Sequence, residues 1–183
     1  MTWAILFFVV KYVVTGLLWL PVIRSGQPLA TVMQGPAGLA ILVATITPTL
    51  VAIALSGVEY GWQGIGDLLR QGTRWRFGIG WYALAVLLIP LVWAVALVTG
   101  LLVGAGAPEV HLDFLIPLAA IGEEFGWRGY ALPRVQPRIG PLPASLLIGV
   151  VWAAWHLPYF AFPEIHPLPF PIDFSLFAKA GRI

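Results

Sequence analysis

The chain has 183 residues, of which 60% are hydrophobic and 10% are charged, and its formal net charge is +2. Soluble domains carry about 25% charged residues, so this composition excludes a soluble domain and indicates an integral membrane protein. The small net charge and the lack of any Lys/Arg run exclude nucleic acid as a partner. The chain contains no cysteine, which excludes disulfides, thiol nucleophiles and cysteine-ligated metals.

Apolar segments of about 20 residues, the length that crosses a bilayer as a helix, follow one another along the chain. They are residues 3–23, 37–56, 78–103, 114–132 and 142–162. In the fourth segment, Asp113 can cap the start of a helix and Pro133 can stop it. Only helices and closed barrels satisfy the backbone in lipid, and the segments lack the alternation of barrel strands. We therefore predict an all-α fold, a polytopic membrane helical bundle of about five transmembrane helices that forms a single domain over residues 1–183.

The positive charges of the connecting loops predict the orientation. Two loops, residues 57–77 and 133–141, lie on the same side of a five-helix bundle and hold Arg70, Arg74, Arg76, Arg134 and Arg138. Cytoplasmic loops carry an excess of Lys and Arg, so we expect this side and the N-terminus to be cytoplasmic, in a bacterial-type cell membrane.

Lys11 lies in the middle of the first predicted span. A lysine at this depth can extend its amine to the membrane interface or meet a polar partner inside the bundle, and we favour these two interpretations. The alternative is a charge with a function at mid-depth.

Four ionisable residues lie in the fourth and fifth predicted spans: Glu123, Glu124, Arg128 and His156. Each costs about 2.5–3.5 kcal/mol or more in the hydrocarbon core, so their retention indicates a functional site. Glu124 and Arg128 are four residues apart on one helix face and can form an ion pair. Glu123 points about 100° away from Glu124 and is predicted to face a cavity.

His156 ends the sequence Trp-Ala-Ala-Trp-His and lies two residues before Pro158, which kinks or ends the helix. In a hairpin of the last two spans, Glu123 and His156 differ in depth by roughly 7 Å, a gap that side chains, tilt and a water can bridge. A carboxylate and an imidazole around a water suit hydrolysis. Glu123 would act as general base, and His156 would stabilise the oxyanion or protonate the leaving amine.

The same residues also have a structural interpretation. Glu124 and Arg128 would then be a buried pair that holds two helices together, and His156 a hydrogen-bonded histidine of the bundle. Glu123 argues against this interpretation, because a second carboxylate adds a desolvation penalty without an evident partner. Two other functions stay open, a non-catalytic membrane scaffold or immunity protein and a proton-coupled transporter subunit.

Two motifs resemble those of a known family. The sequence Glu-Glu-Phe-Gly-Trp-Arg-Gly-Tyr-Ala-Leu-Pro-Arg occupies residues 123–134, and Trp-Ala-Ala-Trp-His-Leu-Pro occupies residues 152–158. They are similar to the Glu-Glu-x-x-x-Arg and aromatic-x-x-x-His motifs of the CPBP family, with Trp152 where Phe is frequent. These are the CAAX-protease and bacteriocin-processing endopeptidases of membranes, also called the Abi or type II CAAX prenyl protease family. The resemblance covers about residues 112–160.

The resemblance implies a role for each matching residue. Glu123 would activate the water, Glu124 and Arg128 would support it, and His156 would be a second catalytic residue. It implies intramembrane proteolysis of a membrane-associated peptide or protein, either a prenylated CaaX protein or a bacteriocin-related substrate.

The chain departs from the family pattern in one respect. The third motif, His-x-x-x-Asn or His-x-x-x-Asp, has no match: His166 is followed four residues later by Phe170, and His111 precedes the first motif. We therefore expect a C-terminally shortened member without the C-terminal helices and third motif, with impaired activity. Catalytic zinc usually has three protein ligands, commonly two of them His. Although the family is often labelled metalloprotease, these residues support zinc only weakly and favour water activated by glutamate without a metal.

Overall fold

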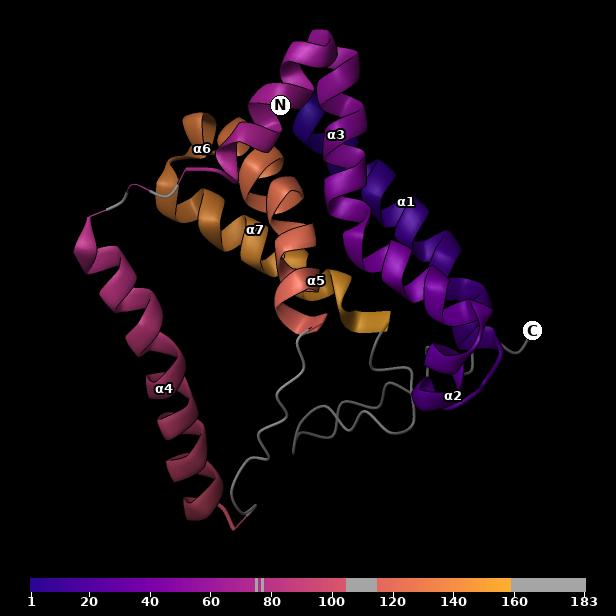
Figure 1. The fold of residues 1–183 in the computed structure, drawn as a ribbon, viewed down its shortest axis with the longest axis vertical. Helices are drawn as coiled ribbons and strands as arrows, with labels where there is room; N and C mark the ends of the chain where they lie inside the picture. Colours follow the sequence, from indigo (N-terminus) through magenta and orange to yellow (C-terminus); the bar gives the residue numbers. More distant parts are fainter. Residues whose placement is uncertain (75, 77, 105–114, 159–183) are drawn as a thin grey trace.

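The computed structural model describes residues 1–74, 76, 78–104 and 115–158, and within these residues every regular element is a helix. The elements are α1 (Thr2–Arg24), α2 (Leu29–Gln34), α3 (Pro36–Gln71), α4 (Ile79–Leu102), α5 (Leu115–Glu124), the π-helix η1 (Phe125–Ala131), α6 (Leu132–Ile139) and α7 (Pro141–Trp155) (Figure 1). The prediction of an all-α membrane protein is confirmed.

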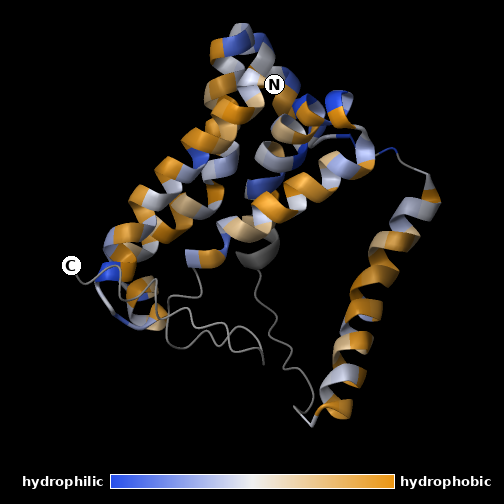
Figure 2. Cartoon of the chain, turned by 180° about the vertical axis from the view of Figure 1, so that it is seen from behind, coloured by the Kyte–Doolittle hydropathy of each residue, from blue (hydrophilic) through white to orange (hydrophobic). Residues whose placement is uncertain are grey.

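Three of the described helices, α1, α3 and α4, are long and apolar enough to cross a membrane, and they correspond to the first three predicted spans. The predicted fourth span is divided between α5 and η1. The fifth begins with α7, which is apolar but 15 residues long and ends at Trp155, before Pro158. Its predicted last residues, from 159 onwards, lie outside the described part of the chain. Figure 2 shows the dominance of hydrophobic residues along the long helices.

The region predicted as the loop 57–77 is helical as far as Gln71, so this boundary of the prediction is wrong. Gly61 interrupts α3 with φ 62° and ψ −154°, a backbone conformation that residues other than glycine rarely adopt. The chain folds back there and brings Gly64 close to Ser56. A Cβ on Gly64 would lie 2.5 Å from the carbonyl oxygen of Ser56. The sequence pattern did not indicate this reversal between two helical segments, because glycine is unfavourable inside a helix and usually marks its end.

The predicted hairpin 133–141 contains the helix α6, and Pro133 does not end the helical run. Pro133 lies in the first turn of α6, a position that tolerates proline because its backbone N–H is not needed for a helical hydrogen bond. The short helix α2 was also missed, because its six residues fall in a predicted loop.

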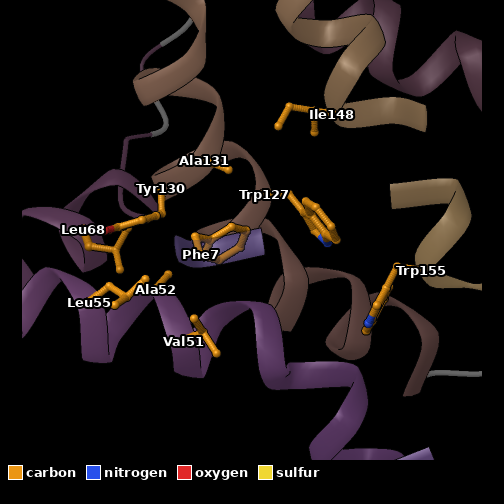
Figure 3. Close-up of a cluster of buried hydrophobic side chains, with 10 residues drawn as sticks. All are labelled: Phe7, Val51, Ala52, Leu55, Leu68, Trp127, Tyr130, Ala131, Ile148 and Trp155. Atoms are coloured by element: carbon orange, nitrogen blue, oxygen red, sulfur yellow. The ribbon is translucent and has the colours of Figure 1, made fainter. Parts of the chain in front are cut away.

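Helices α1 and α3 pack side by side, and α3 also contacts α5 and η1, while α6 packs against α7. One hydrophobic cluster joins α1, α3, η1 and α7 (Figure 3). It consists of Phe7, Val51, Ala52, Leu55, Leu68, Trp127, Tyr130, Ala131, Ile148 and Trp155. By contrast, α4 lies apart from these helices in Figure 1, and none of its residues is buried.

Two glycines explain how closely η1 and α5 approach α3. A Cβ on Gly126 would lie 2.4 Å from the backbone carbonyl of Pro48, and one on Gly122 would lie 2.8 Å from the side chain of Ile46. Both distances are too short for real contacts, so a larger residue would push the helices apart. The first motif is therefore held directly against α3.

Candidate active site

The two carboxylates of the first motif stand at the junction between α5 and η1. Glu123 is buried, with 8% of its surface exposed, while Glu124, the last residue of α5, is half-buried. Beyond Glu124 the helix changes to i→i+5 bonding for seven residues, Phe125–Ala131. Such π segments are rare and are often found at functional sites.

Glu123 binds a side chain from α7. The indole Nε1–H of Trp152 donates a hydrogen bond to Oε2 of Glu123, at 2.8 Å. The bond joins residues 29 positions apart and connects the first motif to the second. No partner for Glu123 was evident from the sequence, and in the structure the partner is Trp152.

Glu124 and Arg128 form the predicted ion pair, in which Nη1 of Arg128 donates to Oε1 of Glu124. The pair lies within one helical run, and its side chains are 41% and 71% exposed, respectively. It therefore does not match the structural interpretation, which required a buried pair joining two helices. Its geometry orients Glu124 beside Glu123.

His156 follows α7 directly, and its ring is held on three sides. Its Nδ1 lies 3.0 Å from the carbonyl oxygen of Trp152. A carbonyl oxygen only accepts, so Nδ1 carries the hydrogen and Nε2 is the nitrogen left for another partner. The rings of Trp152 and Trp155 both meet the imidazole edge-to-face, with centroids 4.9 Å away.

A cavity of about 430 Å³ brings the predicted residues together. It is lined by Glu123, Glu124 and His156, and also by Trp19, Thr45, Ala119, Ala120, Trp152 and Trp155. The predicted difference in depth therefore does not separate the carboxylates from the imidazole. Arg128 does not line this cavity. It faces a neighbouring one of about 240 Å³, which shares Glu124 and Trp152 as walls.

Helix α1 contributes residues that the sequence analysis did not connect to the site. The Tyr12 hydroxyl donates to the carbonyl of Val151 in α7. The indole N–H of Trp155 donates to Oγ1 of Thr15, at 3.1 Å. Tyr12 and Thr15 lie three residues apart and share a helix face, and that spacing was the available signal. These bonds tie α1 to the helix that carries His156.

Lys11 lies on the same region of α1 and is fully buried. Its Nζ is 3.6 Å from the ring centre of Tyr12, 4.1 Å from that of Trp127 and 5.2 Å from that of Trp155. Among the described residues it has no hydrogen-bond partner. The amine does not reach the membrane interface, so the snorkelling interpretation is wrong. The polar group whose charge interacts with it is Glu123. Three aromatic faces surround the amine, two of them from the motif segments.

A second ion pair holds the end of the first motif. Nη2 of Arg134 lies 2.6 Å from Oε2 of Glu59 in α3, and the hydroxyl of Tyr130 donates to the same oxygen at 3.0 Å. The guanidinium also stacks over the Tyr130 ring, 3.6 Å from its centre. Glu59 and Arg134 are 75 residues apart, so no local spacing predicts their contact.

The described residues fit a metal ion poorly. Within that part of the chain no three His, Asp or Glu side chains gather closely enough to hold one. Glu123 and His156 are each already hydrogen-bonded to Trp152. We therefore assign no step to a metal. His111 and His166, neither of which matches the third motif, lie outside the described residues.

Comparison with known proteins bears on the segment that carries both motifs. Residues 110–179 match the family described as type II CAAX prenyl endopeptidase, Rce1-like. A 49-residue stretch is 49% identical to CAAX prenyl protease 2 from Methanococcus maripaludis. The predicted resemblance to the CPBP family is confirmed. The aligned stretch is 27% of this chain and 18% of that relative, so less than a fifth of the relative's length is matched.

The match of residues 110–179 to the Rce1-like prenyl endopeptidases and the three long apolar helices agree that this is an integral membrane protein. The family and the relative are both described as prenyl proteases or endopeptidases, which are hydrolases.

Proposed function

We propose that this chain is an intramembrane endopeptidase that hydrolyses a peptide bond of a membrane-associated protein with water activated by Glu123. The observation that carries the proposal is the shared cavity, in which a buried carboxylate and an imidazole with an available Nε2 face the same space. The relative's description as a CAAX prenyl protease favours a prenylated CaaX protein over a bacteriocin-related substrate.

The reaction uses groups that this chain supplies. A water between Glu123 and the scissile carbonyl gives its proton to the carboxylate as its oxygen attacks the carbonyl carbon. Because Nδ1–H of His156 is bound to the Trp152 carbonyl, the negative charge on the substrate's carbonyl oxygen is stabilised from Nε2, which donates a hydrogen bond when the imidazole is protonated at both nitrogens. The C–N bond then breaks as Glu123 passes the proton that it took from the water to the leaving amine, which restores the carboxylate. Glu124, paired with Arg128, lies next to Glu123 on the same helical segment and supports it.

The surroundings of the cavity suit a membrane substrate. The arginine-bearing connections and the N-terminus lie on the cytoplasmic side in this proposal, in a bacterial-type cell membrane. A prenyl group would remain in the bilayer while the peptide enters the cavity. The indole rings of Trp19, Trp152 and Trp155 give the cavity an apolar wall beside its carboxylates.

The test is cleavage of a fluorogenic farnesylated CaaX peptide by the full chain in lipid vesicles. Glu123→Gln keeps the size of the side chain and removes the base, so cleavage falls about 10²–10⁴-fold. Asp67→Asn is the matched carboxylate-to-amide control, because Asp67 is exposed and pairs with Arg70 on the surface of α3. It retains wild-type cleavage.

Unchanged cleavage by Glu123→Gln overturns the catalytic assignment. A wild-type chain that captures the peptide without cleaving it, with capture unaffected by Glu123→Gln, supports the non-catalytic scaffold instead. Melting temperatures of all variants establish that the changes act on the reaction and not on folding.

A further inference from the structure

We propose that Trp152 is a positioning residue that couples the base Glu123 to His156. The inference rests on the proposed function and adds a residue to it. It is based on three contacts of Trp152, two made by its side chain and one by its backbone carbonyl. Together they reach both Glu123 and His156.

The first contact fixes the carboxylate. The Nε1–H of Trp152 donates to Oε2 of Glu123 at 2.8 Å, within a cavity wall that both residues form. Indole nitrogen is only a donor, so Trp152 cannot itself take the proton of the attacking water. Its bond therefore orients the carboxylate and leaves proton transfer to Glu123.

The other contacts fix the imidazole. Trp152 and His156 are four residues apart, and Nδ1 of His156 bonds to the Trp152 carbonyl at 3.0 Å. The Trp152 ring meets the imidazole edge-to-face, with centroids 4.9 Å apart and an angle of 82° between the planes. The carbonyl sets which nitrogen carries hydrogen, and the ring limits rotation of the imidazole.

Core packing does not account for Trp152. Its side chain is 44% exposed, whereas Trp155, one turn further along α7, is 6% exposed and belongs to the hydrophobic cluster. Trp152 lines both the 430 Å³ cavity and the 240 Å³ cavity. A large ring kept half-exposed in the walls of two cavities, with its N–H on Glu123, fits a role in the site.

The experiment removes the N–H and keeps a ring. Trp152→Phe keeps the carbonyl contact and an aromatic face but has no N–H donor. We expect kcat for the farnesylated peptide to fall about 10- to 100-fold, which corresponds to the loss of a hydrogen bond to a charged group. KM changes less than threefold. The isosteric replacement of Trp152 by benzothienylalanine keeps the full ring and shows the same loss of kcat. Trp93→Phe in α4, half-exposed and remote from the cavity, is the control and keeps wild-type kcat and KM.

A second measurement does not depend on activity. The indole ¹⁵N–¹H resonance of Trp152, assigned by its loss in Trp152→Phe, shifts when Glu123→Leu removes the acceptor. The resonance of Trp93 does not shift.

Wild-type kcat in both Trp152 variants overturns the positioning role. An indole resonance of Trp152 that does not shift in Glu123→Leu overturns it as well. If the wild-type chain shows no cleavage that depends on Glu123, the proposed function fails. The NMR shift then decides separately whether Trp152 holds Glu123.

Discussion

Helices α1 and α4 have nearly the same length and are both strongly apolar, yet they relate to the site in opposite ways. Helix α1 has 23 residues, packs along α3 and contacts the segments that carry both motifs. Helix α4 has 24 residues, none of them buried. Apolar length places a helix in the membrane, but in lipid it gives no preference for one apolar neighbour over another.

The difference between the two helices lies in a few polar and aromatic groups. Lys11, Tyr12 and Thr15 give α1 specific contacts to η1 and α7. The sequence of α4 contains no charged residue at all. Specific packing in membranes depends on close approach and on hydrogen bonds. Four changes, compared with matched changes elsewhere, test whether the site depends on those features.

The largest effect is expected at Gly126, where η1 meets α3. Gly126→Ala places a Cβ 2.4 Å from the Pro48 carbonyl, which is backbone and cannot move aside alone. Overpacking of this kind lowers the free energy of unfolding by about 3 kcal/mol. Gly80→Ala in α4 has nothing within 4 Å and is expected to be neutral or stabilising. Reversible unfolding in mixed micelles measures both, and equal effects at the two glycines would contradict the packing described here.

The next effect concerns the Glu59–Arg134 pair. Its side chains are 9% and 22% exposed, so Glu59→Gln leaves a guanidinium mostly desolvated without its counter-charge. We expect a loss of about 2–3 kcal/mol in the free energy of unfolding, somewhat less than for a fully buried pair. The same measurement on Asp67→Asn, whose partner Arg70 is 79% exposed, should show less than about 1 kcal/mol. A larger loss for Asp67→Asn than for Glu59→Gln would reverse this ranking.

A smaller effect is expected where α1 binds α7. Trp155→Phe removes the bond to Thr15 and leaves that hydroxyl without its donor, which lowers the free energy of unfolding by about 1–2 kcal/mol. Trp93→Phe in α4 changes it by less than about 0.5 kcal/mol. Chemical denaturation in the same micelles distinguishes the two, and a neutral Trp155→Phe would show that α1 does not depend on this bond.

The smallest effect on stability is expected at Lys11. Lys11→Met replaces a desolvated amine that has no hydrogen-bond partner among the described residues with an apolar side chain of similar length. We therefore expect the free energy of unfolding to stay the same or to rise by about 1 kcal/mol, because the desolvation penalty disappears. A thermal melt measures it. A clear loss of stability would show that the three aromatic faces compensate fully for the buried amine.

Local spacing was enough to predict part of the site. The four-residue separation of Glu124 and Arg128 predicted their ion pair, because residues at that distance share a helix face whatever surrounds them. Pro158 was predicted to kink or end its helix, and α7 ends three residues before it, at Trp155, although the predicted span ran on to residue 162. Pro133 and Gly61 were harder, because each can either stop a helix or lie inside a continuous helical run, and only the neighbouring helices decide between these outcomes.

The amino-acid sequence by itself determined that this is an all-α membrane protein and which ionisable groups belong to its two motifs. Composition and spacing carry that information without reference to the fold. The tertiary structure alone decided that Trp152 binds Glu123, that Glu59 binds Arg134, and that Lys11 lies among aromatic rings. These contacts join residues from 29 to more than 100 positions apart. Such pairs meet only when whole helices pack, and packing in lipid depends on shape and on buried polar partners that no short pattern encodes.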